Sequence, residues 1–246
     1  MSEHPQRIYL YAIIDGDAPL AAPVTGFAAV RVTLLPVQTL AAVIGPVTTE
    51  QIKDTAAAAL VHEHVVETLM ATRRVLPVRF GTVFSSEAAL AAALNVRHAS
   101  LCADLERLDG RVEIGVRVLW DGAARRTQAS AAQRARRTEP IAEAGPGLQY
   151  MQARMDELAV ERDLRRAAEG IAHAWEQRLA PFAAALTTKA LATEEIPVSL
   201  ACLVAHSEVA ALVAAVAAFP PHESDIRAVC TGPWPPYHFV TDAQGE

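Results

Sequence analysis

An apolar run close to the start of the chain restricts the fold more than any other segment. Residues 8–14 read IYLYAII, so both alternating sets of side chains are apolar or aromatic. Successive side chains of a β-strand point to opposite faces of its sheet. A strand with two apolar faces must be covered on both sides. We therefore expect this strand to lie centrally in a sheet.

The rest of the first half reads as short strands and helices. Its clearest helix signal is a capping-box pattern, in which Gln51 follows Thr48 by three residues and precedes apolar residues at helical spacing. A helix is therefore expected over about residues 49–71. The other elements expected here are strands at 28–35, 39–44, 75–84 and 112–120 and two short helices over 86–108.

A change of composition divides the chain. Residues 123–147 are polar and rich in Arg and Ala, and Gly145-Pro146-Gly147 closes the stretch. Such a segment is typical of a linker. We therefore expect an N-terminal domain of residues 1–122, a linker of residues 123–147 and a C-terminal domain of residues 148–246.

The C-terminal domain is expected to open with a long helix over about residues 148–187, kinked at Pro181, because apolar residues recur on one face at spacings of three and four. Strands at 198–204 and 226–231, with a helix capped by Ser207 between them, complete the pattern. Strands and helices do not alternate regularly in either half. Both domains are therefore predicted to be α+β, each a small mixed or antiparallel sheet packed with helices, with a ferredoxin-like arrangement as one form of it.

Composition and charge argue against several classes of function. The net charge of −6 gives no general attraction to nucleic acid or to an anionic membrane surface. No segment reaches the roughly 18 uncharged apolar residues of a membrane span, and no signal-peptide pattern precedes the first strand. The three cysteines lie far apart and predict neither a disulfide framework nor a zinc site. We expect a cytoplasmic protein with no nucleic-acid partner and no membrane partner.

One cluster has side chains that could bind a metal ion, namely His62, Glu63, His64 and Glu67. On a helix His62 and His64 would point about 200° apart, so they could not share one ion. A polar helix surface is the favoured interpretation. The common catalytic and nucleotide-binding motifs are also missing from the sequence. No catalytic residue, metal site or cofactor is therefore expected.

Five arginines of the predicted linker form a basic stretch that could meet phosphate. Sites for nucleic acid usually add aromatic or base-reading side chains, and no aromatic residue lies among these arginines. A solvated linker or helix face is therefore favoured. The five are Arg125, Arg126, Arg134, Arg136 and Arg137.

Two segments resemble signatures of a known family. Residues 75–84, VLPVRFGTVF, resemble the LPVRFGTVF-type signature of the gas vesicle protein F/L family, and residues 231–239, TGPWPPYHF, resemble its terminal GPWPPYxF motif. The segments 8–12 and 62–66 also agree in placement, so the resemblance covers nearly the whole chain. One departure is Ser199, where an Asn-like residue is expected.

The resemblance implies a two-domain α+β protein without enzymatic activity or cofactor. It implies a role in gas vesicle formation, with two kinds of partner: the small, hydrophobic major shell protein and other gas vesicle accessory proteins. The protein would act in the cytoplasm and at the gas vesicle, with a minor wall component as a variant. The alternative from another class is a ligand-binding or enzymatic α+β protein with an interdomain pocket.

The first motif supplies three candidate partner-binding residues, Arg79, Phe80 and Gly81. In one interpretation the segment is a structural strand, with Arg79 paired to a carboxylate and Phe80 in the core. In the other, an exposed strand edge here adds a strand of the partner.

The second motif supplies four further candidates, Trp234, Pro235, Tyr237 and Phe239. Its prolines stiffen the chain, which lowers the entropy cost of holding the rings in place. The segment either packs across its own domain or exposes its rings together as an apolar patch that needs a partner.

Overall fold

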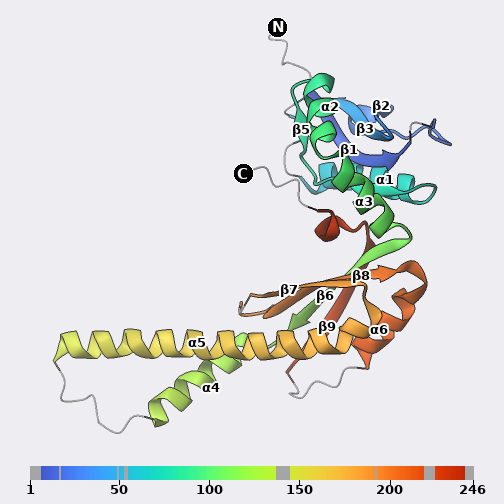
Figure 1. Ribbon diagram of the computed structural model, residues 1–246. Coiled ribbons are helices and arrows are strands. Elements are labelled where there is room, and N and C mark those ends of the chain that lie inside the picture. Colours follow the sequence, from blue (N-terminus) through green and yellow to red (C-terminus); the bar gives the residue numbers. More distant parts are fainter. Residues whose placement is uncertain are drawn as a thin grey trace. The chain divides into compact units, whose positions relative to one another are not determined.

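The computed structural model describes residues 7–16, 18–48, 50–52, 55–136, 145–191, 193–218 and 225–241 (Figure 1). The chain divides into two compact units. Unit 1 consists of Met1–Glu113 with Trp234–Glu246, and unit 2 consists of Ile114–Pro233. Each unit has its own sheet and helices, which confirms the predicted α+β class.

The sheet of unit 1 is antiparallel, with strand order β2-β3-β1-β4, and β5 also pairs with β1. The central strand is therefore the apolar run at the start of the chain, as predicted. The strands are β1 (Arg7–Asp15), β2 (Thr33–Val37), β3 (Leu40–Val47), β4 (Val75–Pro77) and β5 (Val83–Phe84), and the helices are α1 (Ala56–Met70), α2 (Glu87–Val96) and α3 (His98–Leu108).

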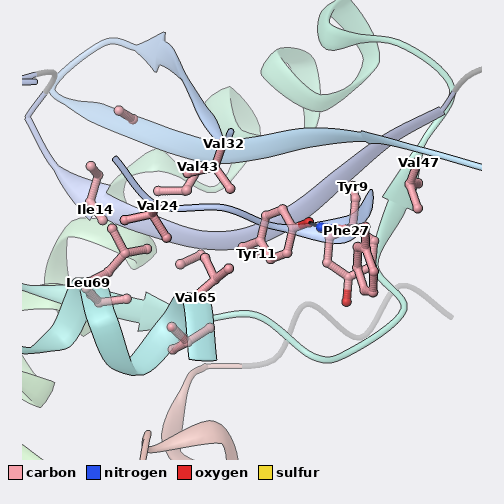
Figure 2. Close-up of a cluster of buried hydrophobic side chains, with 14 of the residues drawn as sticks. Tyr9, Tyr11, Ile14, Val24, Phe27, Val32, Val43, Val47, Val65 and Leu69 are labelled. Carbon is pink, nitrogen blue, oxygen red and sulfur yellow. Dashed lines mark hydrogen bonds between the residues drawn. The ribbon is translucent and has the colours of Figure 1, made fainter. Parts of the chain in front are cut away.

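A β-bulge sets which side chains of β1 point to each face. Leu10 pairs with Ile44, and Ala12 pairs with the next residue, Val43, so Tyr11 is an extra residue on this strand. Four side chains of β1 therefore enter the core beneath α1, where Figure 2 shows the two tyrosines beside Phe27 and Val65. These four are Tyr9, Tyr11, Ala12 and Ile14.

The first helix of the structure begins later than predicted. Gln51 Oε1 does accept a hydrogen bond from the Thr48 backbone N–H at 2.9 Å, but residues 50–52 form a turn. The N-cap of α1 is Thr55, whose side chain accepts from the backbone N–H of Ala58. Residues 49, 53 and 54 of the predicted helix lie outside the described residues. The strand expected at 28–35 also begins later, because residues 27–29 form a 3₁₀ turn.

Unit 2 has the chain order β-α-β-β-α-β of a ferredoxin-like fold, with two helices in the first crossover. Its strand order is β7-β8-β6-β9. The core lies between this sheet and the helices α5 and α6. The elements are β6 (Arg111–Leu119), α4 (Gly122–Ala135), α5 (Pro146–Leu179), β7 (Ala185–Ala190), β8 (Val198–Ala205), α6 (Val209–Ala217) and β9 (Arg227–Trp234).

Two boundaries in unit 2 differ from those predicted. Pro181 does not kink a helix to residue 187; α5 ends at Leu179 and Pro181 lies in a 3₁₀ turn, because proline lacks the N–H that would continue the helix. Ser207 also lies in a 3₁₀ turn, and no side chain caps α6.

Part of the predicted linker is a helix. Asp121 accepts from the backbone N–H of Ala124 and caps α4, which packs against α5. Arg125 makes a bidentate ion pair with Asp225, with N–O distances of 2.9 and 3.0 Å, so this arginine already has a partner. Residues 137–144, which include Arg137, lie outside the described residues.

The two units also differ from the predicted domains at both ends of unit 2. Strand β6 belongs to the second sheet, between β8 and β9, so unit 2 begins before residue 122. The end of the chain returns to unit 1, because its residues from Tyr237 to Thr241 bond to side chains of that unit. Both differences arise because segments far apart in the sequence pair with one another, and no local sequence pattern marks such pairing.

Candidate partner-binding site

The first family motif forms an interrupted edge strand of unit 1. Val78 N–H donates to the Tyr11 carbonyl at 3.3 Å, and Leu10 N–H donates to the Thr82 carbonyl at 3.1 Å, so both ends of the interruption are held on β1. Arg79, Phe80 and Gly81 lie between these two bonds, in a turn outside both β4 and β5. The turn is closed by Thr82 Oγ1, which donates to the Arg79 carbonyl at 2.7 Å.

Gly81 adopts a backbone conformation that favours glycine, with φ of +86°. No atom lies within 4 Å of where a Cβ would stand, so a larger residue would meet backbone strain and no clash. We expect Gly81→Ala to lower the free energy of unfolding by about 1–2 kcal/mol.

Gly170→Ala is the matched control for this prediction, because Gly170 lies inside α5 and also has open space at its Cβ position. It should raise stability by roughly 0.5–1 kcal/mol, since alanine is the better helix former. Urea unfolding of the two variants checks the opposite signs. Equal effects would contradict the role assigned to the conformation of Gly81.

A buried histidine of α1 lies behind this turn. The Tyr9 hydroxyl is 2.9 Å from His62 Nδ1 and accepts a hydrogen bond from the Gly81 N–H at 3.0 Å. His62 is only 2% exposed, and burial lowers its pKa to about 4. The imidazole is therefore neutral at pH 7, with the Tyr9 O–H placed to donate to Nδ1.

The two family motifs meet at His62. The ring of Phe80, from the first motif, has its centroid 6.0 Å from that of His62, and the ring of Tyr237, from the second, is 6.1 Å away. The Tyr237 hydroxyl donates to Glu63 Oε2 at 2.9 Å. Burial raises the pKa of Glu63, and the bond from Tyr237 acts in the opposite direction.

Buried carboxylates hold the rest of the second motif and the residues that follow it. Glu113 is 5% exposed and accepts from His238, with its two oxygens 3.0 Å from the backbone nitrogen and 2.7 Å from Nδ1. Asp104 accepts from Thr241, from the backbone N–H at 2.6 Å and from Oγ1 at 2.8 Å. Arg107 donates to both Asp104 and the Phe239 carbonyl. The segment is thus fixed on unit 1 at several points.

A groove of about 530 Å³ lies beside the two motifs, on the face of the sheet opposite α1. Its lining is mainly apolar, and its two charged residues are Arg79 and Arg97. Tyr237 and Val240 contribute the C-terminal side. The remaining lining residues are Leu10, Ile13, Leu76, Pro77, Val78, Thr82, Phe84, Ala93, Leu94 and Leu101.

The structure separates the seven candidates into different environments. Phe80 and Tyr237 are half-buried and join the cluster at His62, and Arg79 is exposed and lines the groove. The rings of the second motif do not share one exposed patch, because Phe239 is buried whereas Trp234 is 42% exposed. Pro235 is buried, and Gly81 is exposed.

Sequence reasoning missed His62, and its assignment to a polar helix surface was wrong. The signal was present, because His62 falls on the same stripe as Ala58, Val65 and Leu69, which are buried at helical spacing. His64 and Glu67 are exposed, as expected of a solvated face. In the part of the chain that the structure describes, no group of three His, Cys, Asp or Glu side chains could hold a metal ion.

Comparisons with known proteins agree with the resemblance of the two motifs. A family model described as gas vesicle synthesis protein GvpL/GvpF matches residues 7–241. Gas vesicle protein F2 of Halobacterium salinarum is 28% identical over 244 residues, which cover 98% of this chain and 94% of the relative.

Solved structures show the same fold. The crystal structure of GvpF from Anabaena sp. PCC7120 matches with a TM-score of 0.76 at 21% identity, and the match covers 98% of each chain. That of GvpF from Microcystis aeruginosa matches with a TM-score of 0.73 at 18% identity, covering 96% of this chain and 99% of the other. None of the described helices is both long enough and apolar enough to cross a membrane. From the match over residues 7–241, the chain belongs to the GvpL/GvpF family of gas vesicle synthesis proteins.

Proposed function

We propose that the protein is a non-enzymatic accessory protein of gas vesicle formation that binds the major shell protein before it enters the vesicle wall. The observation that carries the proposal is the groove of unit 1, because residues of both family motifs line it. It would act in the cytoplasm and at the gas vesicle, together with other accessory proteins.

The chemistry of the groove suits an apolar peptide segment. Most of its lining side chains are aliphatic or aromatic, and burial of apolar surface contributes about 25 cal/mol per Å². The exposed guanidinium of Arg79 can meet a carboxylate of the bound segment. A small hydrophobic shell protein has such apolar segments to cover as long as it is unassembled.

Binding to the unassembled form would also explain an accessory role. A protein that binds only the free subunit lowers the concentration of exposed apolar surface and so opposes aggregation by mass action. Release would follow when shell–shell contacts compete for the same surface.

Co-purification with co-expressed shell protein tests the proposal. The intact chain should form a soluble complex, and Arg79→Glu should weaken it by about tenfold or more, because the reversed charge would repel the carboxylate. The control is Arg117→Glu, an equal charge change at an exposed position of β6 that does not line the groove.

Circular dichroism should confirm that both variants remain folded. No complex with the intact chain would overturn the proposed binding. Equal weakening by Arg79→Glu and Arg117→Glu would show that net charge, and not the groove, determines the interaction.

A further inference from the structure

The turn that carries Arg79 is held in place through its backbone. At Gly81 no atom lies within 4 Å of where a Cβ would stand, so packing around that position does not fix this residue. The Gly81 N–H instead donates to the Tyr9 hydroxyl at 3.0 Å, and Thr82 Oγ1 donates to the Arg79 carbonyl at 2.7 Å. The conformation of the turn therefore depends on hydrogen bonds, and a side chain of β1 accepts one of them.

The Tyr9 hydroxyl is itself fixed by α1. Burial raises the pKa of Tyr9, so the hydroxyl keeps its proton at pH 7. Its oxygen lies 2.9 Å from His62 Nδ1, which accepts the hydroxyl proton when the neutral imidazole carries its own proton on Nε2. The Gly81 N–H thus donates to Tyr9 and the Tyr9 O–H donates to His62, so that each bond strengthens the other.

His62 also packs against a ring of each family motif. Its ring centroid is 6.0 Å from that of Phe80 and 6.1 Å from that of Tyr237. Phe80 follows Arg79 in the turn, and Tyr237 lines the C-terminal side of the groove of unit 1. Neither His62 nor Tyr9 lines this groove. The two buried residues therefore support parts of the groove that they do not themselves form.

We propose that Tyr9 and His62 are positioning residues of the groove, which hold the turn of Arg79, through Gly81, in the conformation that binds the shell protein. Their role rests on the shell-protein binding proposed above and adds to it two residues that do not touch the bound segment. A turn without the bond to Tyr9 samples more conformations, because glycine restricts the backbone least. Ordering that turn again on binding lowers the affinity.

Tyr9→Phe tests the first bond, because it removes the hydroxyl and keeps the ring. The amide of Gly81 should then exchange its hydrogen about tenfold faster or more, as measured by NMR. Binding of co-expressed shell protein should weaken by about fivefold or more. Tyr11→Phe is the matched control, since Tyr11 is as deeply buried and its hydroxyl accepts from a backbone N–H, that of Phe27, at 2.9 Å. Phe27 does not line the groove, so this variant should change shell-protein binding by less than about twofold.

A pair of variants at His62 tests the second bond. Asparagine and leucine have side chains of nearly the same shape, but only asparagine offers an oxygen that can accept from the Tyr9 O–H in place of Nδ1. His62→Asn should therefore keep shell-protein binding to within about twofold of the intact chain, whereas His62→Leu should weaken it by about threefold or more. Equal binding by these two variants would overturn the role of His62.

The results separate the role of Tyr9 from a general weakening of the core and from the proposed function. Urea unfolding should show that Tyr9→Phe and Tyr11→Phe are destabilised to a similar extent and stay folded under the conditions of binding. Equal losses of binding in these two variants, or unchanged exchange at Gly81 in Tyr9→Phe, would overturn the role of Tyr9. An intact chain that binds no shell protein would overturn the proposed function itself. Binding that Tyr9→Phe leaves unchanged would overturn only the positioning role.

Discussion

Between pH 7.5 and pH 4.5 the intact chain is expected to lose about 2–3 kcal/mol more of its free energy of unfolding than a His62→Gln variant loses. The cause is the burial of His62 between Tyr9, Phe80 and Tyr237, which lowers its pKa from 6.5 to about 4. In the unfolded chain His62 takes up a proton as the pH falls through 6.5, whereas in the folded chain it stays neutral until about pH 4. Protonation therefore favours the unfolded state throughout this window.

The effect of His62 on the free energy of unfolding can be separated from that of the neighbouring carboxyl group, Glu63. The pKa of Glu63 is raised in the folded state, so its contribution to stability increases as the pH falls, opposite to that of His62. The comparison with His62→Gln cancels this term, because Glu63 is present in both proteins. Urea unfolding followed by circular dichroism at several pH values measures the difference.

His64→Gln is the matched control, since His64 lies two residues away on the same helix and is exposed. Its free energy of unfolding should change with pH as that of the intact chain does, to within about 0.5 kcal/mol over the whole pH range. A pH dependence of His62→Gln that equals that of the intact chain would show that folding does not lower the pKa of His62.

Local patterns in the sequence predict most of the elements of the fold. The two apolar faces of residues 8–14 predict a central strand, and β1 does lie between β3 and β4. Ser86 precedes an apolar helical pattern and is the N-cap of α2, accepting from Ala89. These predictions hold because the determining residues are neighbours in sequence.

The rest depends on contacts that no local pattern marks. The bulge at Tyr11 arises from the register between β1 and β3, so the alternation of side chains alone assigns Ala12 to the wrong face. The pattern of β6 is that of any half-buried strand and does not tell which sheet it joins. The candidate site also depends on contacts between distant segments, since Glu63 and its partner Tyr237 are 174 residues apart.

Asp104→Ala is expected to lower the free energy of unfolding by roughly 2–4 kcal/mol, because a buried carboxylate with several hydrogen bonds would be lost. Asp104 is 2% exposed and accepts from Thr241 and Arg107. Its removal leaves the backbone N–H of Thr241 without this acceptor. Glu106→Ala, an exposed change on the same helix, should cost no more than about 0.5 kcal/mol in urea unfolding.

The same variant should also weaken binding of shell protein. Asp104 anchors Thr241, and the adjacent Val240, with Tyr237, forms one side of the groove of unit 1. Loss of the anchor should let this side move, which would appear as faster hydrogen exchange at the amides of His238 and Thr241 under conditions where the protein stays folded. If Asp104→Ala loosened these amides and left the affinity for shell protein unchanged, the groove could not be the surface that binds it. If both changed together and Glu106→Ala changed neither, the C-terminal motif would act by shaping the groove, and its exposed Trp234 would not be needed for that role.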